Sequence, residues 1–79
     1  MNNLVELIAT LIEDIADIPA DEITSESYIM DDLDMSSLEI MSVIAEVERK
    51  YSISISENEL LKIKTVGDLS ELISDKIKS

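Results

Sequence analysis

Residues 31–40 read Asp-Asp-Leu-Asp-Met-Ser-Ser-Leu-Glu-Ile. A serine followed three places later by a glutamate, just ahead of an apolar run, is typical of the capping box that begins a helix. With Ser36 as the N-cap, Ser37 is the first helical residue, and its hydroxyl lies beside backbone N–H groups that the helix leaves unpaired. The positive end of the helix dipole would favour an attached phosphate there. An ordinary helix cap with no further role would show the same pattern.

Apolar residues recur at three- and four-residue spacing on both sides of this stretch, which predicts amphipathic helices. The first helix is expected over residues 3–15, because the residue before Pro19 is pushed towards extended geometry. The second helix is expected over residues 37–51. Its inward stripe is expected to be Ile40, Val43, Ile44, Val47 and Tyr51.

Two further caps predict the rest of the fold. Ser56 and Glu59 repeat the capping-box spacing and open a short helix that includes residues 60 and 61. Thr65 and Asp68 have the same spacing at the start of a last helix. The chain is therefore predicted to be all-α, a four-helix bundle of three main helices and one short helix, with a single domain over residues 1–79. The inward residues of the last helix are expected to be Val66, Leu69, Leu72, Ile73 and Ile77.

A long loop over residues 20–35 separates the first two helices. A loop of this length in a small domain is usually functional or packed by its own side chains. Ile23, Tyr28 and Leu33 are accordingly expected to dock on the bundle. Residues 51–55 alternate like a strand but have no obvious partner strand, so an extended connector is expected there.

The chain carries 18 Asp and Glu against 6 Lys and Arg, a formal net charge of −12. This charge repels nucleic acid and favours protein partners with basic patches. Glu6, Glu13 and Asp14 interrupt the first apolar run, so neither an export signal nor a membrane span is expected. The absence of Cys fits a reducing compartment. We expect a monomeric, cytoplasmic protein that binds neither nucleic acid nor membranes.

Catalytic and metal-binding sets are poorly represented. The chain has no Cys and no His, which excludes Cys–His and Ser–His–Asp catalysis and a thiolate zinc site. Asp32 and Asp34 fit two positions of an EF-hand loop, but Ser37 replaces its Gly and Val43 replaces its closing Glu. We expect no enzyme and no dedicated metal site, only weak binding of divalent cations to the acidic surface.

The predicted second helix has another apolar row outside its inward stripe, made of Leu38, Met41 and Ala45. Such a row is a partner surface in one interpretation, since Met adapts to varied shapes. In the other interpretation these side chains widen the buried face of the helix.

The order of these features resembles that of the acyl carrier proteins. Ser27 and Tyr28, followed by Asp-Leu-Asp-Met-Ser-Ser-Leu at residues 32–38, are similar to the family's Ser-Phe, spacer and Asp-Leu-Gly-x-Asp-Ser-Leu. The acidic helix that ends at Tyr51 resembles the family's second helix, and residues 62–69 resemble its Ile-x-Thr-Val approach to the last helix. The resemblance covers nearly the whole chain.

The resemblance implies a stand-alone carrier, not an enzyme, that holds acyl groups as thioesters on a 4′-phosphopantetheine arm, for fatty acid, polyketide or related biosynthesis. Ser37 aligns with the serine to which a phosphopantetheinyl transferase attaches the arm from coenzyme A. Acyl-transferring or condensing enzymes with basic patches are the other implied partners. By position, the partner-binding residues are Leu38, Glu39, Met41 and Glu48.

In such a carrier, a short acyl chain could shelter between the helices, and Ile44, Val47 and Ile63 are the expected lining. Four positions depart from the family pattern. Ser36 stands where the family has Asp, Asp34 stands where it has Gly, and Ser42 and Arg49 stand where acids are frequent. Because of the change at Ser36, the sequence leaves open whether a standard transferase recognises this site. The same change favours one alternative, an acidic protein-interaction module that is never phosphopantetheinylated. An aminoacyl or peptidyl carrier of the same fold is another.

Overall fold

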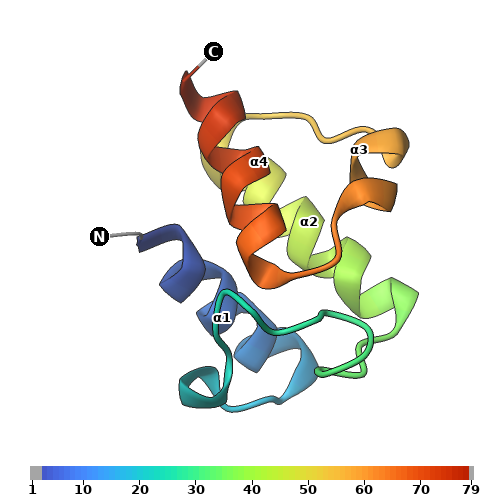
Figure 1. Cartoon of the computed structure of the whole chain (residues 1–79). Coiled ribbons are helices and arrows are strands. Elements are labelled where there is room, and N and C mark those ends of the chain that lie inside the picture. The colour runs from blue at the N-terminus through green and yellow to red at the C-terminus, as the bar shows by residue number, and fades with distance from the viewer. Residues whose placement is uncertain (1–2, 79) are drawn as a thin grey trace.

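The computed structural model describes residues 3–78, and within that range the chain forms four α-helices and one short 3-10 helix. The prediction of an all-α bundle with a long first connection is confirmed (Figure 1). The 3-10 helix was not expected. In residues 3–78 the only β-type pairing is an isolated antiparallel bridge. The elements are α1 (Asn3–Ala16), η1 (Ala20–Glu22), α2 (Ser37–Tyr51), α3 (Glu57–Lys62) and α4 (Val66–Lys78).

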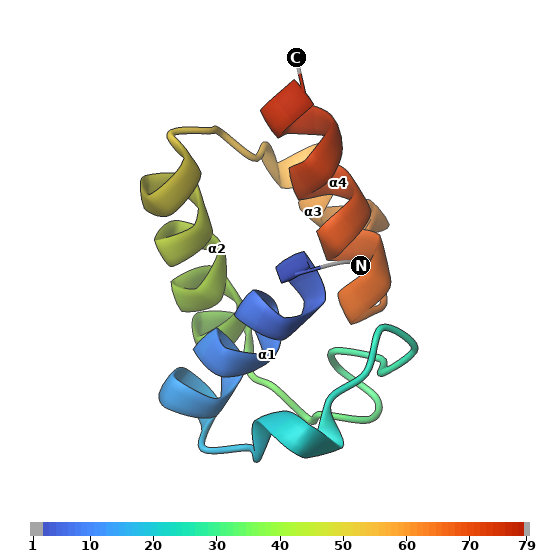
Figure 2. The ribbon, with the colours of Figure 1, turned by 90° about the vertical axis from the view of Figure 1, so that its left-hand side faces the viewer.

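Helix α1 packs against both α2 and α4, and Figure 2 shows it lying between them. Each of these helices turns an apolar stripe into one shared core, as the three- and four-residue spacing predicts. Full burial of one such side chain contributes roughly 1.5–3 kcal/mol, so this shared core is the main source of stability. Its most completely buried apolar side chains, none more than 2 % exposed, are Ile8, Ile12, Val47, Val66, Leu69 and Ile73.

The expected stripe of α4 is correct except at its end. Val66, Leu69 and Ile73 are buried and Leu72 is half-buried, but Ile77 is 46 % exposed, so the prediction for Ile77 is wrong. The reason is position along the helix. The last turn of α4 projects past the rest of the bundle (Figures 1 and 2), which leaves Ile77 open to solvent.

The loop between α1 and α2 docks on the bundle through Ile23, Ile29 and Met35, which are buried, while Leu33 is half-buried. The prediction for Tyr28 is wrong, because its side chain is 47 % exposed. The backbone of Tyr28 is what docks, through the isolated bridge to Thr65. This bridge turns the tyrosine outward and its neighbour Ile29 inward.

The start of α4 is tied to the same loop by backbone hydrogen bonds. The Ile29 N–H donates to the Lys64 carbonyl (2.9 Å) and the Val66 N–H to the Ser27 carbonyl (3.0 Å). The Gly67 N–H donates to the Ser25 carbonyl at 2.8 Å. A Cβ atom at position 67 would lie only 2.9 Å from that oxygen, so the close approach of the two backbones explains a glycine in the first turn of a helix.

Helix α2 is closed by the C-cap Ser52, which has a left-handed backbone with φ of 55°. The chain then continues without a strand to α3, so the prediction of an extended connector is confirmed. Glu48 holds this connector, since its Oε2 accepts the Ile55 N–H at 2.7 Å. The side chain of Ile55 is buried below this hydrogen bond, and Ile53 is half-buried.

Candidate functional site

The start of α2 is the reciprocal cap that the sequence predicts. The Ser36 Oγ accepts the Glu39 N–H at 3.2 Å, and the Glu39 Oε1 accepts the Ser36 N–H at 2.8 Å. The backbone of Ser36 is extended, with φ of −76° and ψ of 164°, as an N-cap requires. Two of the backbone donors at this helix end are therefore paired.

Ser37 is the first residue of α2, and it is exposed. Within residues 3–78 its hydroxyl has no hydrogen-bond partner, so the oxygen is open to solvent and to reagents. The N–H groups of the first helical residues have no intrahelical acceptor and, with the helix dipole, give this end a partial positive charge. A negatively charged group attached to Ser37 would therefore be stabilised.

Asp34 and Met35, the two residues that precede the cap, set the path by which the loop enters α2. Asp34 has a left-handed backbone with φ of 52°, and Met35 is buried with 4 % exposure. Met35 and Ile40 occupy the positions of a hydrophobic staple around the N-cap, and both line the same cavity. Sequence reasoning did not identify Met35 as a core residue, although its staple spacing to Ile40 was a usable signal.

The outer apolar row of α2 is a surface, not a wider core. Leu38 is 79 % exposed and Met41 is 61 % exposed, and Ala45 is exposed as well. Of the two interpretations of this row, the one in which its side chains widen the buried face of α2 is wrong. Leu38 and Met41 lie within about one turn of Ser37 on the same helix.

The two glutamates expected to contact partners both have tasks inside the fold. Glu39 is half-buried and closes the capping box, and Glu48 is half-buried and holds the connector to α3. Each carboxylate therefore already accepts a hydrogen bond from a backbone N–H of this chain. Their partner-binding role stays a prediction.

Sequence reasoning missed two exposed apolar residues outside α2. Met30, in the long loop, is 61 % exposed, and Leu61, on α3, is 76 % exposed. For Leu61 a signal was present, because the adjacent Leu60 takes the inward direction of this short helix and successive helical residues face different sides. For Met30 the local sequence carries no comparable signal.

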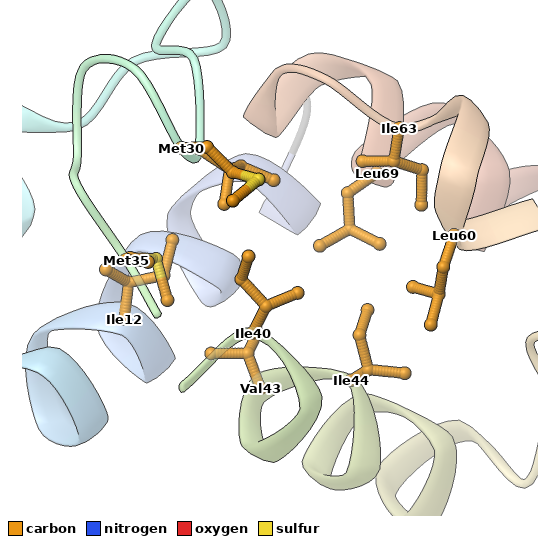
Figure 3. A pocket seen from close by; sticks show the side chains of 10 residues that line it. Ile12, Met30, Met35, Ile40, Val43, Ile44, Leu60, Ile63 and Leu69 are labelled. Atoms are coloured by element: carbon orange, nitrogen blue, oxygen red, sulfur yellow. The ribbon is translucent and has the colours of Figure 1, made fainter. Parts of the chain in front are cut away.

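A cavity of about 100 Å³ lies between the three main helices, α3 and the loop (Figure 3). Ile44 and Ile63 line it as predicted, but Val47, which is fully buried in the core, is not among its lining residues. All lining side chains are aliphatic or thioether groups. Dry apolar cavities of similar size in proteins accept small hydrocarbon molecules. The lining residues are Ile12, Ile29, Met30, Met35, Ile40, Val43, Ile44, Leu60, Ile63 and Leu69.

Two carboxylates that lie away from Ser37, those of Glu59 and Asp68, have a lowered pKa. The Ser56 N–H, and then the Lys76 ammonium, lower the pKa of Glu59. The N–H groups of Lys64 and Thr65, which donate to Asp68 Oδ2 at 3.1 and 3.2 Å, lower the pKa of Asp68. Both carboxylates act as local caps, which favours their charged form.

In the part of the chain that the structure describes, no group of three or more His, Cys, Asp or Glu side chains is arranged to hold a metal ion. Over the same residues, none of the helices combines the length and apolarity that crossing a membrane requires.

Comparison with known proteins adds a family match that covers most of the chain. Residues 6–73 match the family model described as "Phosphopantetheine attachment site". An acyl carrier protein of Acidothermus cellulolyticus is 34 % identical over 68 residues, which are 86 % of this chain and 81 % of that protein. A meromycolate extension acyl carrier protein of Mycobacterium tuberculosis is 39 % identical over 62 residues, 78 % of this chain and 54 % of that protein.

The fold is also similar to a solved structure. The solution structure of a holo acyl carrier protein from Geobacter metallireducens superposes with a TM-score of 0.80 at 28 % identity. The match covers 96 % of this chain and 87 % of that one.

Proposed function

Because this chain belongs to the acyl carrier protein family, we propose that Ser37 is the residue that bears its prosthetic group. The group is 4′-phosphopantetheine, and the protein is a carrier, not an enzyme. The observation that carries the proposal is the exposed, unpaired hydroxyl at the first position of α2.

The residues around Ser37 suit a phosphodiester at this place. The attached phosphate would meet the positive end of α2, where the capping box occupies only the N–H groups of Ser36 and Glu39. The arm supplies a terminal thiol that can hold an acyl group as a thioester, which this cysteine-free chain has no means to do itself. The protein positions that thiol and shelters what it carries.

The apolar cavity points to the kind of cargo. Ile40, which lines it, lies three residues after Ser37, about 4.5 Å further along the axis of α2. The side chains that line the cavity offer no hydrogen-bond partner. A charged ammonium or a row of keto groups would therefore lose hydration in the cavity without compensation. The lining therefore favours a short hydrocarbon acyl group, as in fatty acid synthesis, over a polyketide, aminoacyl or peptidyl group.

Synthases and transferases are the general partners of the family. For this chain we place their contact on the exposed side of α2 next to Ser37, at Leu38 and Met41, with Glu39 and Glu48 beside it. The net charge of −12 favours basic patches on those enzymes and on the phosphopantetheinyl transferase that would modify Ser37 from coenzyme A. We propose that residues 1–79 form one domain and that the carrier is monomeric and cytoplasmic.

Mass spectrometry tests the proposed site. The protein is incubated with coenzyme A and a transferase of broad specificity, and we expect the mass of one phosphopantetheine to be added. Ser37→Ala should abolish the gain, whereas Ser36→Ala, which removes only the neighbouring hydroxyl, should retain it. Loading the product with a butyryl group should shift the amide signals of the cavity-lining residues.

Three results would count against parts of this proposal. A mass gain that persists in Ser37→Ala would mean that another residue carries the arm. The absence of any gain with several transferases would favour the acidic interaction module. Unchanged amide signals in the butyryl form would mean that the cargo stays outside the cavity.

A further inference from the structure

The most exposed side of α2 contains no acidic residue, although the whole chain has a net charge of −12. At 3.6 residues per turn, five residues of the helix fall within an arc of about 100° and extend over about 16 Å of its axis. All five are exposed, and we call them the outer face of α2: Leu38, Met41, Ser42, Ala45 and Arg49. This face is apolar or small over most of its length and ends in a cation.

The three glutamates of α2 lie beside the outer face, and each already has a donor. Glu39 and Glu48 accept backbone N–H groups at 2.8 and 2.7 Å. Both carboxylate oxygens of Glu46 accept from the Nη2 of Arg49. A basic group on a partner would have to share each of these carboxylates with an existing donor, which weakens the attraction that the partner gains.

Arg49 is the more accessible member of its ion pair. Its side chain is 76 % exposed, against 42 % for Glu46. A guanidinium carries five N–H donors in a planar fork that suits a carboxylate, and Glu46 meets only one of its nitrogens. The helix dipole favours a cation in the last turn, but the exposed Lys50 next to Arg49 meets that preference as well. The C-terminal end of the outer face can therefore bind a carboxylate from outside the chain.

Unpaired negative charge lies at the opposite end of α2. Asp31 and Asp34 in the preceding loop are exposed, and within residues 3–78 neither side chain has a hydrogen-bond or ion-pair partner. Asp34 comes three residues before the first residue of the helix. Along the axis of α2 the surface thus changes from acidic, through apolar, to cationic.

We infer that the outer face of α2 binds a protein surface with the reverse order of charge. That surface has basic residues next to Asp31 and Asp34, an apolar pocket for Leu38 and Met41, and an acidic residue opposite Arg49. The net charge of −12 attracts basic proteins from a distance. At contact, a patch that is basic throughout would place a cation against Arg49, and like charges that face each other disfavour a complex. Arg49 is therefore the residue that selects among partners. That the partner handles acyl groups rests on the proposed function, whereas the order of charge along α2 does not.

A titration followed by nuclear magnetic resonance tests the inference. The unmodified, 15N-labelled protein is titrated with a condensing enzyme of fatty acid synthesis whose docking patch is basic, and the dissociation constant is measured. The titration is repeated with versions of that enzyme in which each basic residue of the patch is changed to Glu in turn. We expect one of these versions to bind about threefold more tightly than the parent enzyme, which is the range of an exposed ion pair. Arg49→Gln should abolish this gain.

The reverse change on the carrier should have the matching effect. Arg49→Glu should bind the parent enzyme about threefold more tightly than the wild type does. Lys78→Glu makes the same change in net charge at the exposed end of α4, and should tighten binding less, because it acts only through the screened field of the whole molecule. Urea unfolding of the same variants checks that each is folded under the conditions of the titration.

Three results would overturn the inference. Equal tightening by Arg49→Glu and Lys78→Glu would show that only net charge matters. A gain that survives in Arg49→Gln would place the new contact elsewhere, and binding to none of the enzyme versions would exclude this class of partner. Since no arm is attached in these measurements, their failure leaves the assignment of Ser37 unchanged, and an unmodified Ser37 would not alter the charge preference that they measure.

Discussion

Ser36 shows how one side chain can differ from a family pattern without cost to the fold. Serine and aspartate cap helices about equally well, and the Ser36 Oγ makes the expected bond to the Glu39 N–H. The difference from aspartate is therefore one of charge on an exposed surface next to Ser37. Any consequence should be found in the recognition of this site by the modifying enzyme, not in stability.

Asp68 is a side chain whose charge the fold uses, and it gives a prediction for pH. Its Oδ2 accepts two N–H groups, which lower its pKa in the native state below the ordinary 3.8. A lowered native pKa means that the stabilisation is fully present above the unfolded pKa and is lost as the pH falls through the native value. Asp68→Asn keeps an accepting oxygen but not the charge, and should lower the free energy of unfolding near neutral pH by about 0.5–1 kcal/mol.

Urea unfolding at about pH 7 and about pH 3 measures this difference. Glu71→Gln, on the exposed side of the same helix, makes the same change in net charge and is the control. The difference in the free energy of unfolding between Asp68→Asn and Glu71→Gln should be clear at neutral pH and should shrink in acid. A gap that stays constant over this range would show that the charge of Asp68 plays no part.

The first turn of α4 is limited by the loop that crosses it. Gly67→Ala would ordinarily stabilise a helix by about 1 kcal/mol. Here the new Cβ would lie 2.9 Å from the Ser25 carbonyl oxygen, so the loop backbone has to move and its hydrogen bond from the Gly67 N–H weakens. We expect a net loss of about 1–2 kcal/mol in thermal or urea unfolding. Ser74→Ala, later in α4, should be nearly neutral, and equal behaviour of the two variants would contradict the steric account.

The local features of the elements were predictable because their signals lie within a few residues. The caps at Ser36 and Ser56 need only the next three residues, and the structure contains both. The direction of Tyr28 was not predictable, since it depends on pairing with Thr65, far along the chain. The same limit applies to the cavity, where Val47 was expected and Met35 was missed.

For the whole chain, the net charge of −12 predicts a dependence on salt. Self-repulsion weakens the compact state, and ions screen it within about 10 Å at 0.1 M. Added NaCl or MgCl₂ should raise the melting temperature, and relief of about 1 kcal/mol corresponds to roughly 4–8 °C for a domain of this size. Calorimetry across a salt series measures the effect, and at about pH 4, where many carboxylates are protonated, the rise should be smaller. A melting temperature that does not change with ionic strength would refute the prediction.

The placement of the two tyrosines also decides what optical spectroscopy of this protein can detect. The chain has no Trp or Phe, so Tyr28 and Tyr51 give the entire aromatic signal. Tyr28 lies exposed in the loop, and Tyr51 is half-buried at the last residue of α2. Near-ultraviolet absorbance, circular dichroism and intrinsic fluorescence therefore report on the loop before α2 and on the end of α2, and do not detect changes in the aliphatic core. Isotope-labelled methyl groups are the better probe of that core.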